Sequence, residues 1–229
     1  MRPLLELKGI TFSYPGGEPV LKGIDFRLDF DEKVGLWGHN GAGKTTLFHI
    51  IMGLERPSAG EILFEGKLVA GRKDLMALRR KVGFLFQDAD DQLFCPTLLE
   101  DVAFGPLNLG LSPTEARDKA VATLDLLGIA ELADRPPYSL SGGQKKLGAI
   151  ATILAMDPIA LILDEPTGSL DEDACALLER LLVATGTAIL VASHDKAFIE
   201  KVAFKGYLLS DGRLLNLPRD GQQALPKGA

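Results

Sequence analysis

The sequence lacks the features that mark secreted and membrane-spanning proteins. Only two cysteines, Cys95 and Cys175, occur in 229 residues, and they form no Cys-x-x-Cys pair. We therefore expect two unpaired thiols in a reducing compartment rather than a disulfide framework. No run approaches the ~18 consecutive apolar residues of a membrane span, and the first six residues lack the apolar core of a signal peptide. These absences predict a cytoplasmic protein that needs a partner subunit for any role at a membrane.

Basic charge and sequence repetition are also scarce. The chain has 25 Lys and Arg against 31 Asp and Glu, and 25 − 31 gives a net charge of −6. This balance does not favour a nucleic-acid partner, and none is expected. The hydrophobic fraction of 46% and the charged fraction of 24% are ordinary for a globular protein. No internal repeat is present, so we expect one copy of each motif rather than a tandem pair.

The chain begins with residues typical of strands. Residues 4–10 and 20–30 are rich in β-compatible side chains on either side of a turn at Tyr14-Pro15-Gly16-Gly17. The short apolar run 33–37 then leads into a Gly-rich loop and a helical stretch over 44–52. That order of strand, loop and helix is half of a βαβ unit.

Two later apolar runs, 159–163 and 187–192, are uninterrupted rather than alternating. Such runs are typical of parallel strands that are covered on both faces. The segment 171–184 between them has helical periodicity and predicts the crossover helix. The apolar run 82–86 is a further expected strand, and residues 204–209 and 213–215 are the last two.

The middle of the chain reads as helical. Helices are predicted over 98–107, 113–127 and 131–133, and Ser112 followed by Pro113 is a good helix start.

The Gly-rich loop matches G-x-x-x-x-G-K-[ST] in full, as Gly38-His39-Asn40-Gly41-Ala42-Gly43-Lys44-Thr45. Glycines let backbone N–H groups converge on phosphate oxygens, and the following helix directs its positive N-terminus at the same anion. The loop therefore predicts a site for ATP. Lys44 is expected at the β- and γ-phosphates, and the Thr45 hydroxyl is expected to bind Mg²⁺.

Two acids, Asp164 and Glu165, follow the apolar run 159–163. A strand end beside a phosphate loop is where ligands sit in open α/β sheets. Asp164 is expected to hold Mg²⁺, directly or through water, and Glu165 to polarise the attacking water. A solvated turn is the alternative for this pair taken alone, because acids often follow strands.

The stretch Leu140-Ser141-Gly142-Gly143-Gln144 separates one family from other phosphate-loop proteins. Through this stretch the chain resembles the ATP-binding-cassette transporter ATPases, whose signature it is. Ser141 and the two glycines are expected at a helix start, where they could grip a γ-phosphate. In that family the grip acts in trans, so the resemblance implies that two ATP molecules are held between two ATPase subunits.

The resemblance extends over almost the whole chain, in the order of the family. Tyr14 falls where an aromatic ring stacks on adenine, with a surface-turn tyrosine as the alternative. Gln87 falls at the lid-loop glutamine that senses Mg²⁺ and couples to the membrane domain, and Glu165 falls at the general base. The segment Ser169-Leu170-Asp171 resembles the loop that crosses between subunits, and His194 falls at the switch histidine that contacts the γ-phosphate.

The expected site can now be assembled. The ATP-binding residues are Tyr14, Gly38, His39, Asn40, Gly41, Ala42, Gly43, Lys44, Thr45 and Thr46 in one subunit, with Ser141, Gly142, Gly143, Gln144 and Asp171 supplied in trans. The expected catalytic residues are Glu165, His194, Lys44 and Gln87. The expected Mg²⁺ ligands are Thr45, Gln87 and Asp164.

The resemblance also implies a fold and a division of the chain. The expected class is α/β, with a phosphate-loop NTPase core of mixed or parallel sheet, an N-terminal antiparallel β subdomain and an inserted α-helical subdomain. One ATPase domain would occupy 1–229. Its core lobe would span about 1–87 and 158–216, its helical subdomain 88–157, and a fraying tail 217–229.

The segments 86–97 and 100–106 look like the cobalt/nickel and energy-coupling-factor branch, which imports transition-metal ions and vitamins. The acids at 88–91 are not expected to bind metal, because no His or Cys lies among them; helix capping or contact with the basic groups of a partner is expected instead. The groove for a coupling helix of the membrane subunit has four candidate lining residues, Phe94, Leu98, Leu99 and Phe104, with the core of the helical lobe as an equal alternative. One departure from the branch is the segment Lys145-Lys146-Leu147-Gly148, which is less Arg-rich than usual.

The resemblance thus implies an ATP-driven motor, peripheral on the inner face of the cell membrane. Its expected partners are a second ATPase subunit, identical or a sibling, and an integral membrane subunit. The alternative is a cassette that acts without a membrane subunit, in DNA repair or translation. Repair members insert long coiled coils, and this chain has no sustained heptads; translation members usually carry two cassettes in one chain. Both features favour transport.

Overall fold

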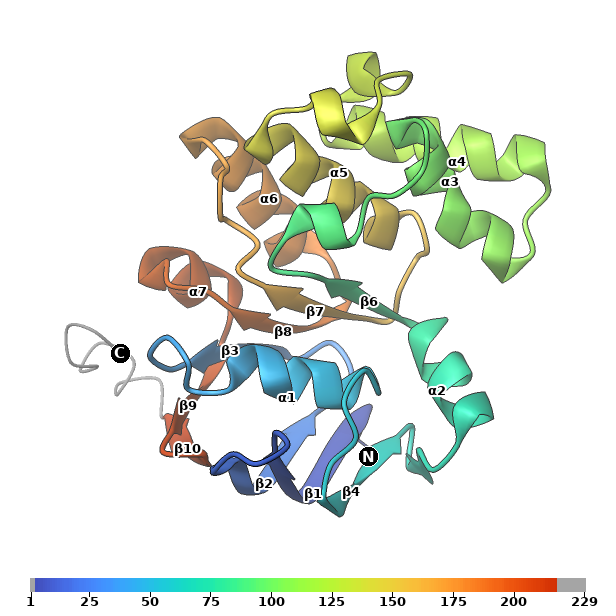
Figure 1. Cartoon of the computed structure of the whole chain (residues 1–229). Coiled ribbons are helices and arrows are strands. Elements are labelled where there is room, and N and C mark those ends of the chain that lie inside the picture. The colour runs from blue at the N-terminus through green and yellow to red at the C-terminus, as the bar shows by residue number, and fades with distance from the viewer. Residues whose placement is uncertain (1–2, 218–229) are drawn as a thin grey trace. The chain divides into compact units, whose positions relative to one another are not determined.

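A computed structural model of the chain describes residues 3–217 (Figure 1). The chain forms two compact units. Unit 1 comprises Met1–Arg79 and Gly186–Ala229, and unit 2 comprises Arg80–Thr185. These boundaries differ from those of the expected lobes, because the strands before Gln87 and Glu165 group with the helices. The expected tail 217–229 lies, apart from Leu217, outside the described residues.

Unit 1 holds the N-terminal strands and the last strands of the chain. Its elements are β1 (Leu5–Ser13), β2 (Pro19–Leu28), β3 (Lys33–Trp37), α1 (Lys44–Ile51), β4 (Ala59–Phe64), β5 (Lys67–Leu68), α2 (Arg72–Arg79), β8 (Ala188–Ala192), α7 (Lys196–Val202), β9 (Lys205–Ser210) and β10 (Arg213–Leu217).

The first sheet of unit 1 is antiparallel, in the order β2-β1-β4-β5, and it confirms the expected antiparallel β subdomain. Leu5 pairs with Leu28 on one side and with Phe64 on the other, and all three side chains are buried. Strands β4 and β5 were not predicted from the sequence, because the apolar run 62–64 in the segment 59–68 is short and lies between charged residues.

The second group of strands in unit 1 is mainly parallel. Strand β3 pairs in parallel with β8 and β9, and β10 adds to β9 in the antiparallel sense. Strands β3 and β8 are buried along their whole length, as uninterrupted apolar runs predict. A Cβ on Gly35 would lie 2.4 Å from Ile199 Cγ2 and 2.5 Å from Trp37 Cζ3, so only glycine lets helix α7 pack this closely on β3.

Unit 2 combines two parallel strands with most of the helices. Its elements are β6 (Val82–Leu85), η1 (Ala89–Asp91), α3 (Leu98–Leu109), α4 (Pro113–Leu126), η2 (Ala130–Leu132), η3 (Pro137–Ser139), α5 (Gly142–Leu154), β7 (Ala160–Asp164) and α6 (Glu172–Ala184).

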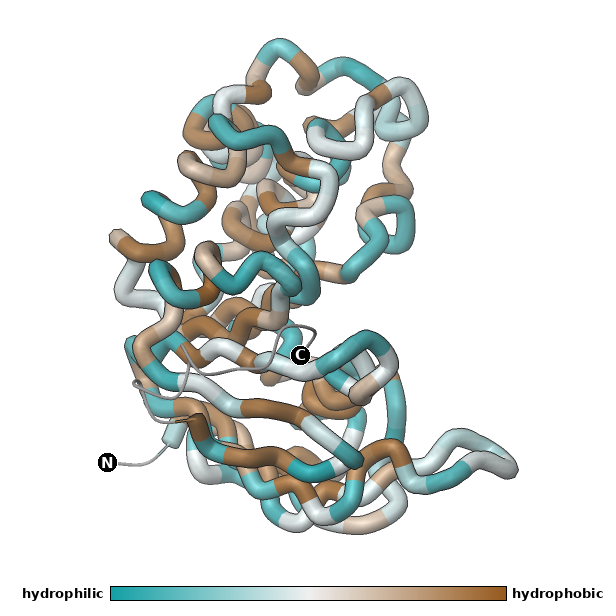
Figure 2. Tube along the Cα trace, turned by 90° about the vertical axis from the view of Figure 1, so that its left-hand side faces the viewer, coloured by the Kyte–Doolittle hydropathy of each residue, from teal (hydrophilic) through white to brown (hydrophobic). Residues whose placement is uncertain are grey.

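The helices of unit 2 begin where their sequences predict. Thr97 with Glu100 and Ser112 with Glu115 form capping boxes at the starts of α3 and α4. Figure 2 shows both hydrophobic and hydrophilic residues within the helical coils of unit 2, as expected when one face of a helix is buried. A Cβ on Gly148 would lie 2.6 Å from Leu98 Cδ1, so a small residue on α5 permits the close approach of α3. Across residues 3–217, none of the helices combines the length and apolar character needed to span a bilayer.

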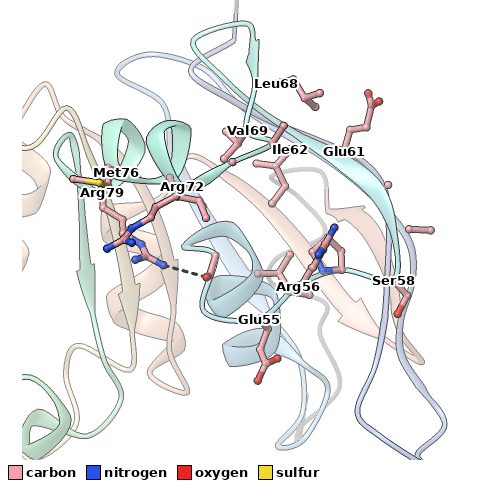
Figure 3. Close-up of a pocket in the computed structure, with 18 residues that line it drawn as sticks. Glu55, Arg56, Ser58, Glu61, Ile62, Leu68, Val69, Arg72, Met76 and Arg79 are labelled. Carbon is pink, nitrogen blue, oxygen red and sulfur yellow. Dashed lines mark hydrogen bonds between the residues drawn. The ribbon is translucent and has the colours of Figure 1, made fainter.

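A cavity of about 830 Å³ lies in unit 1 between the end of α1, strand β4 and helix α2 (Figure 3). Arg79 on its wall donates from Nε to the carbonyl oxygen of Met52, at 2.9 Å, and from Nη2 to that of Gly53, at 3.1 Å. A helix C-terminus leaves carbonyl groups without partners, and a cation there also favours the helix dipole. Arg79 therefore caps α1, the helix that follows the phosphate loop.

We expect Arg79→Met to destabilise the chain by roughly 1–3 kcal/mol, because two charge-assisted hydrogen bonds are lost while the aliphatic stem is retained. Chemical denaturation of the variant measures this change. Arg72→Met, on the same helix and wall of the cavity, is the control and is expected to shift stability by less than about 0.5 kcal/mol. Equal effects of the two substitutions would contradict the capping role.

Candidate functional site

The phosphate loop connects β3 to α1, as its sequence predicts. Helix α1 begins at Lys44, and Gly43 before it has a left-handed backbone with φ of 103°. A Cβ on Gly43 would lie 2.9 Å from Val20 Cγ1, and one on Gly38 would lie 2.7 Å from the carbonyl oxygen of Leu209. These two glycines are therefore required by packing and conformation as well as by phosphate access.

Lys44 is buried and lies over its own loop. Its Nζ donates to the carbonyl oxygen of Gly38 at 2.6 Å and to that of His39 at 3.3 Å. The ammonium group is thus held at the centre of the loop, where the motif predicts contact with phosphate oxygens. A phosphate bound by the loop would offer this group anionic acceptors in place of neutral carbonyls.

Tyr14 lies beside the phosphate-binding helix. Its hydroxyl is 3.1 Å from Thr46 Oγ1, and its ring makes an edge-to-face contact with Phe12 at 4.9 Å between centroids. The ring is 43% exposed, so one face remains accessible. Tyr14 therefore has both the position and the exposed aromatic surface that stacking on a base requires.

His194 follows β8 at the same edge of the sheet as the phosphate loop. In the parallel pair of β3 and β8, Leu36 lies opposite Ala192, and Gly38 and His194 each follow two residues later. Ligands bind at the carboxyl ends of parallel strands. His194 is exposed, and Asp195 after it caps α7 by accepting from the N–H of Phe198 at 3.0 Å.

Gln87, Asp164 and Glu165 share a strand edge in unit 2. Strands β6 and β7 are parallel, and Leu85 lies opposite Leu163. Asp164 is the last residue of β7, and Gln87 and Glu165 come after the strand ends, so all three lie at the carboxyl edge of the pair. Asp164 is buried, and Glu165 has a left-handed backbone with φ of 49°. A non-glycine residue in this conformation is uncommon and is often found at functional sites.

The signature forms a well-capped helix start. Ser141 is the N-cap of α5, and its Oγ accepts from the N–H of Gln144 at 3.3 Å while its own N–H donates to Gln144 Oε1 at 2.9 Å. Ser141 and Gly142 are exposed. The expected helix start is therefore confirmed, and its N-terminus is accessible to an anion.

The segment 169–171 packs on the signature of its own chain. Ser169 has a φ of 67°, and a Cβ on Gly143 would lie 2.7 Å from the Ser169 carbonyl oxygen. Asp171 is the N-cap of α6, accepting from the N–H of Ala174 at 2.8 Å. Asp171 thus has a local structural role beside the role in trans that the family resemblance implies.

The four candidate residues for a partner groove divide into two pairs. Leu98 and Leu99 are buried, so the core alternative holds for them. Phe94 and Phe104 are 67% and 47% exposed and contact each other edge to face at 5.1 Å. Together they form an exposed aromatic pair on unit 2.

The acids of the lid loop make local contacts. Asp88 caps η1 by accepting from the N–H of Asp90 at 2.9 Å, and Asp90 forms an ion pair with Lys145 at 2.6 Å. The expectation that these acids cap helices is confirmed for Asp88. Within the described part of the chain, no group of three or more His, Cys, Asp or Glu side chains is arranged to hold a metal ion. Cys95 and Cys175 form no disulfide.

Two residues near these motifs were not predicted from the sequence. Lys146 is buried on α5, and burial lowers the pKa of its ammonium group while Asp164, Asp88 and Glu165 oppose that shift. Gln92 bridges the lid loop to the same helix. The sequence signal for the burial of Lys146 was its position directly before the segment 147–151, which contains only apolar residues and glycine.

Unit 1 thus presents a phosphate loop with a neighbouring tyrosine and histidine, and unit 2 presents paired acids, a lid-loop glutamine and a signature helix whose start is exposed. These features define a phosphate-loop nucleotide-binding protein of α/β class. Residues 21–168 match the family model described as ABC transporter. The chain belongs to this family; it binds ATP and is an ATPase.

Three related proteins extend the comparison over the rest of the chain. An energy-coupling factor transporter ATP-binding protein, EcfA, from Methanosphaera stadtmanae is 43% identical over 219 residues, covering 94% of this chain and 79% of that protein. The structure of cbiO1 from Clostridium perfringens, part of the ABC transporter complex cbiONQ, matches with a TM-score of 0.81 and 37% identity, covering 94% and 88%. A dimeric ATP-binding cassette in a post-hydrolysis state, bound to ADP and phosphate, matches with a TM-score of 0.84 and 29% identity, covering 94% and 98%.

The packing of Gly143 against Ser169 leads to a test by stability. Gly143→Ala is expected to destabilise the chain by roughly 1–3 kcal/mol, because the new Cβ overlaps a backbone oxygen. Gly142→Ala is the matched control, since its Cβ would lie 3.3 Å from Ser169 Cβ, a contact that a shift of a few tenths of an ångström relieves, and alanine favours the helix. Denaturant unfolding should rank Gly143→Ala well below Gly142→Ala; the reverse order would contradict the packing.

Proposed function

We propose that the chain is the ATP-hydrolysing motor subunit of a membrane importer, and that it works as a dimer closed by ATP. The observation that carries the motor proposal is the exposed and capped N-terminus of α5 at Ser141, a second anion site on a chain that already has a phosphate loop. A single chain needs only one such site to hold one ATP, so the second fits an ATP bound by another subunit.

The similarity to EcfA and to cbiO1 supports the proposal that the importer belongs to the cobalt/nickel and energy-coupling-factor branch. Both similarities cover 94% of this chain. The proposed cargo is therefore a transition-metal ion, cobalt or nickel, or a vitamin. Cargo choice would belong to the membrane subunits, because the motifs of this chain all concern ATP.

The proposed ATP site divides the work between two subunits. In one subunit the phosphate-loop backbone and Lys44 would hold the phosphates, and Tyr14 would stack on the adenine. In the other, Ser141 and the N–H groups that begin α5 would contact the γ-phosphate. Asp171 of the same subunit would contribute to this ATP site in trans, as the family resemblance implies. Closure of the dimer would then depend on ATP, since the nucleotide supplies most of the charge that joins the two surfaces.

Hydrolysis is assigned to residues that follow buried strands. Glu165 would orient the attacking water as general base, and Lys44 and His194 would stabilise the charge on the transferring phosphoryl group. Thr45, Asp164 and Gln87 offer hydroxyl, carboxylate and amide oxygens, the hard donors that Mg²⁺ prefers, and so fit this ion. When bound, Mg²⁺ would neutralise phosphate charge.

The exposed pair of Phe94 and Phe104 supports a site for the membrane partner. Aromatic side chains that remain exposed on a folded surface are enriched at protein interfaces. We propose that the pair contacts the coupling helix, so that movement of unit 2 on ATP binding reaches the membrane subunit. The chain would thus act as a peripheral protein on the inner face of the membrane.

Glu165→Gln tests the general base. The variant should bind ATP normally, because the amide is isosteric, but hydrolyse it at least roughly 100-fold more slowly, and it should accumulate as an ATP-bound dimer. Phosphate release and gel filtration with ATP and Mg²⁺ measure the two effects. Glu131→Gln, an exposed change in unit 2, serves as the control. Turnover at the wild-type rate in Glu165→Gln would show that the base is another residue.

Complementation tests the action in trans. Lys44→Ala should disable the phosphate loop and Ser141→Arg should block the signature, so each variant alone should be inactive. A mixed dimer contains one site with an intact loop and an intact signature, and the mixture should therefore recover part of the ATPase activity. An inactive mixture in which mixed dimers have been detected would contradict assembly of the site from two chains.

A further inference from the structure

Lys146 is a buried lysine that the proposed mechanism does not use. It lies on α5, two residues after the signature, and its exposed fraction is 4%. Burying an ammonium group is costly unless hydrogen bonds and opposite charges replace its water. The groups that surround Lys146 therefore indicate what holds it there.

Hydrogen bonds join Lys146 to the loop of the proposed lid glutamine. The Nζ atom donates to the carbonyl oxygen of Gln87 at 2.6 Å and to that of Phe86 at 3.3 Å. These carbonyls directly follow β6, at the point where the chain leaves the sheet. Because Lys146 fixes the backbone of Gln87 itself, it restricts the directions in which the Gln87 side chain can extend.

Opposite charges complete the surroundings of Lys146. The carboxylates of Asp164, Glu165 and Asp88 interact electrostatically with the ammonium group and oppose the lowering of its pKa by burial. One cation on the signature helix therefore interacts with the lid loop and with both acids of the proposed hydrolytic site.

Gln92 makes a second connection between the same loop and the same helix. Its Oε1 accepts from the N–H of Phe86 at 3.2 Å, and its Nε2 donates to the carbonyl oxygen of Ala149 at 2.9 Å and to Thr152 Oγ1 at 2.7 Å. Positions 146, 149 and 152 are spaced by three and lie along one side of α5. With the more exposed ion pair of Lys145 and Asp90, the lid loop is thus attached at three points to α5.

We propose that Lys146 is a positioning residue that holds Gln87 in place and makes the lid loop move together with the signature helix α5. When the signature of one subunit engages ATP on another, the loop carrying Gln87 would then shift with it, so signature contact and lid-loop placement would occur together. This inference rests on the proposed role of Gln87 in hydrolysis.

The neighbouring Lys145 provides a matched control. It lies on the same turn of α5 and forms an ion pair with Asp90, whose side chain is 64% exposed. Exposed ion pairs of this kind contribute little. Lys145→Met and Lys146→Met therefore remove the same group from adjacent positions, and only the second removes the contacts with Phe86 and Gln87.

The experiment measures steady-state ATPase kinetics and thermal unfolding of the full chain for Lys146→Met, Lys146→Arg, Lys145→Met, Gln87→Ala and the double variant Lys146→Met with Gln87→Ala. We expect Lys146→Met to lower kcat by roughly tenfold to a hundredfold while KM for ATP stays within about twofold, since misplacement affects the reacting geometry more than binding. Lys146→Arg should recover part of kcat because it retains charge and donors. Lys145→Met should stay within about twofold of the wild type.

The double variant separates positioning from general stability. If Lys146 acts through Gln87, adding Lys146→Met to Gln87→Ala should change kcat by less than about twofold. The inference would be overturned if the kcat loss of the double variant equalled the product of the two single losses. It would also be overturned if the loss of kcat in Lys146→Met were fully accounted for by its lower unfolding temperature. Should Lys146→Met not fold, Lys146→Gln replaces it in the same cycle.

The outcome also distinguishes this inference from the proposed function. Wild-type activity of Gln87→Ala would contradict the role of Gln87, on which the inference rests. A slow Gln87→Ala together with an unaffected Lys146→Met would leave the proposed function in place and remove only the positioning role.

Discussion

The ends of completely buried strands decide where this chain can handle a charged substrate. Strands β3, β7 and β8 are buried over their full length, and burying an unpaired charge there would cost several kcal/mol. Polar chemistry is therefore confined to the ends of these strands and to the segments that follow them, with Asp164 as the last residue of β7. Four functional candidates occupy such positions, each within its own unit: Lys44, Gln87, Glu165 and His194. The glycines of the phosphate loop let the backbone there approach an anion.

Several of the functional candidates also stabilise their own elements. Ser141 and Gln144 cap the helix whose N-terminus is proposed to contact ATP, and Asp171 caps α6. A substitution at such a position removes a helix cap as well as any contact in trans. Stability and activity must consequently be measured together for these residues, because a loss of turnover alone does not distinguish the two contributions.

Helix α5 connects the motifs of unit 2. Gly143 permits the close approach of Ser169, Lys146 donates to the carbonyl oxygen of Gln87, and Gln92 of the lid loop donates to the carbonyl oxygen of Ala149 on α5. A rigid helix that holds both the segment 169–171 and the lid loop transmits displacement better than separate loops would, because packed interiors change arrangement as blocks. This arrangement gives a physical basis for coupling between the signature and the lid loop.

The sequence by itself determined the fold class, the phosphate loop, the buried strands and the starts of the capped helices, because these depend on local spacing and residue type. It did not reveal β4, whose pairing with β1 depends on partners distant in the chain, or β5, a two-residue strand that pairs with β4. The sequence also did not distinguish the buried Leu98 and Leu99 from the exposed Phe94 and Phe104, and it indicated no role for Lys146. Only the tertiary structure decided these points, because burial and the partners of a side chain depend on which segments meet in three dimensions.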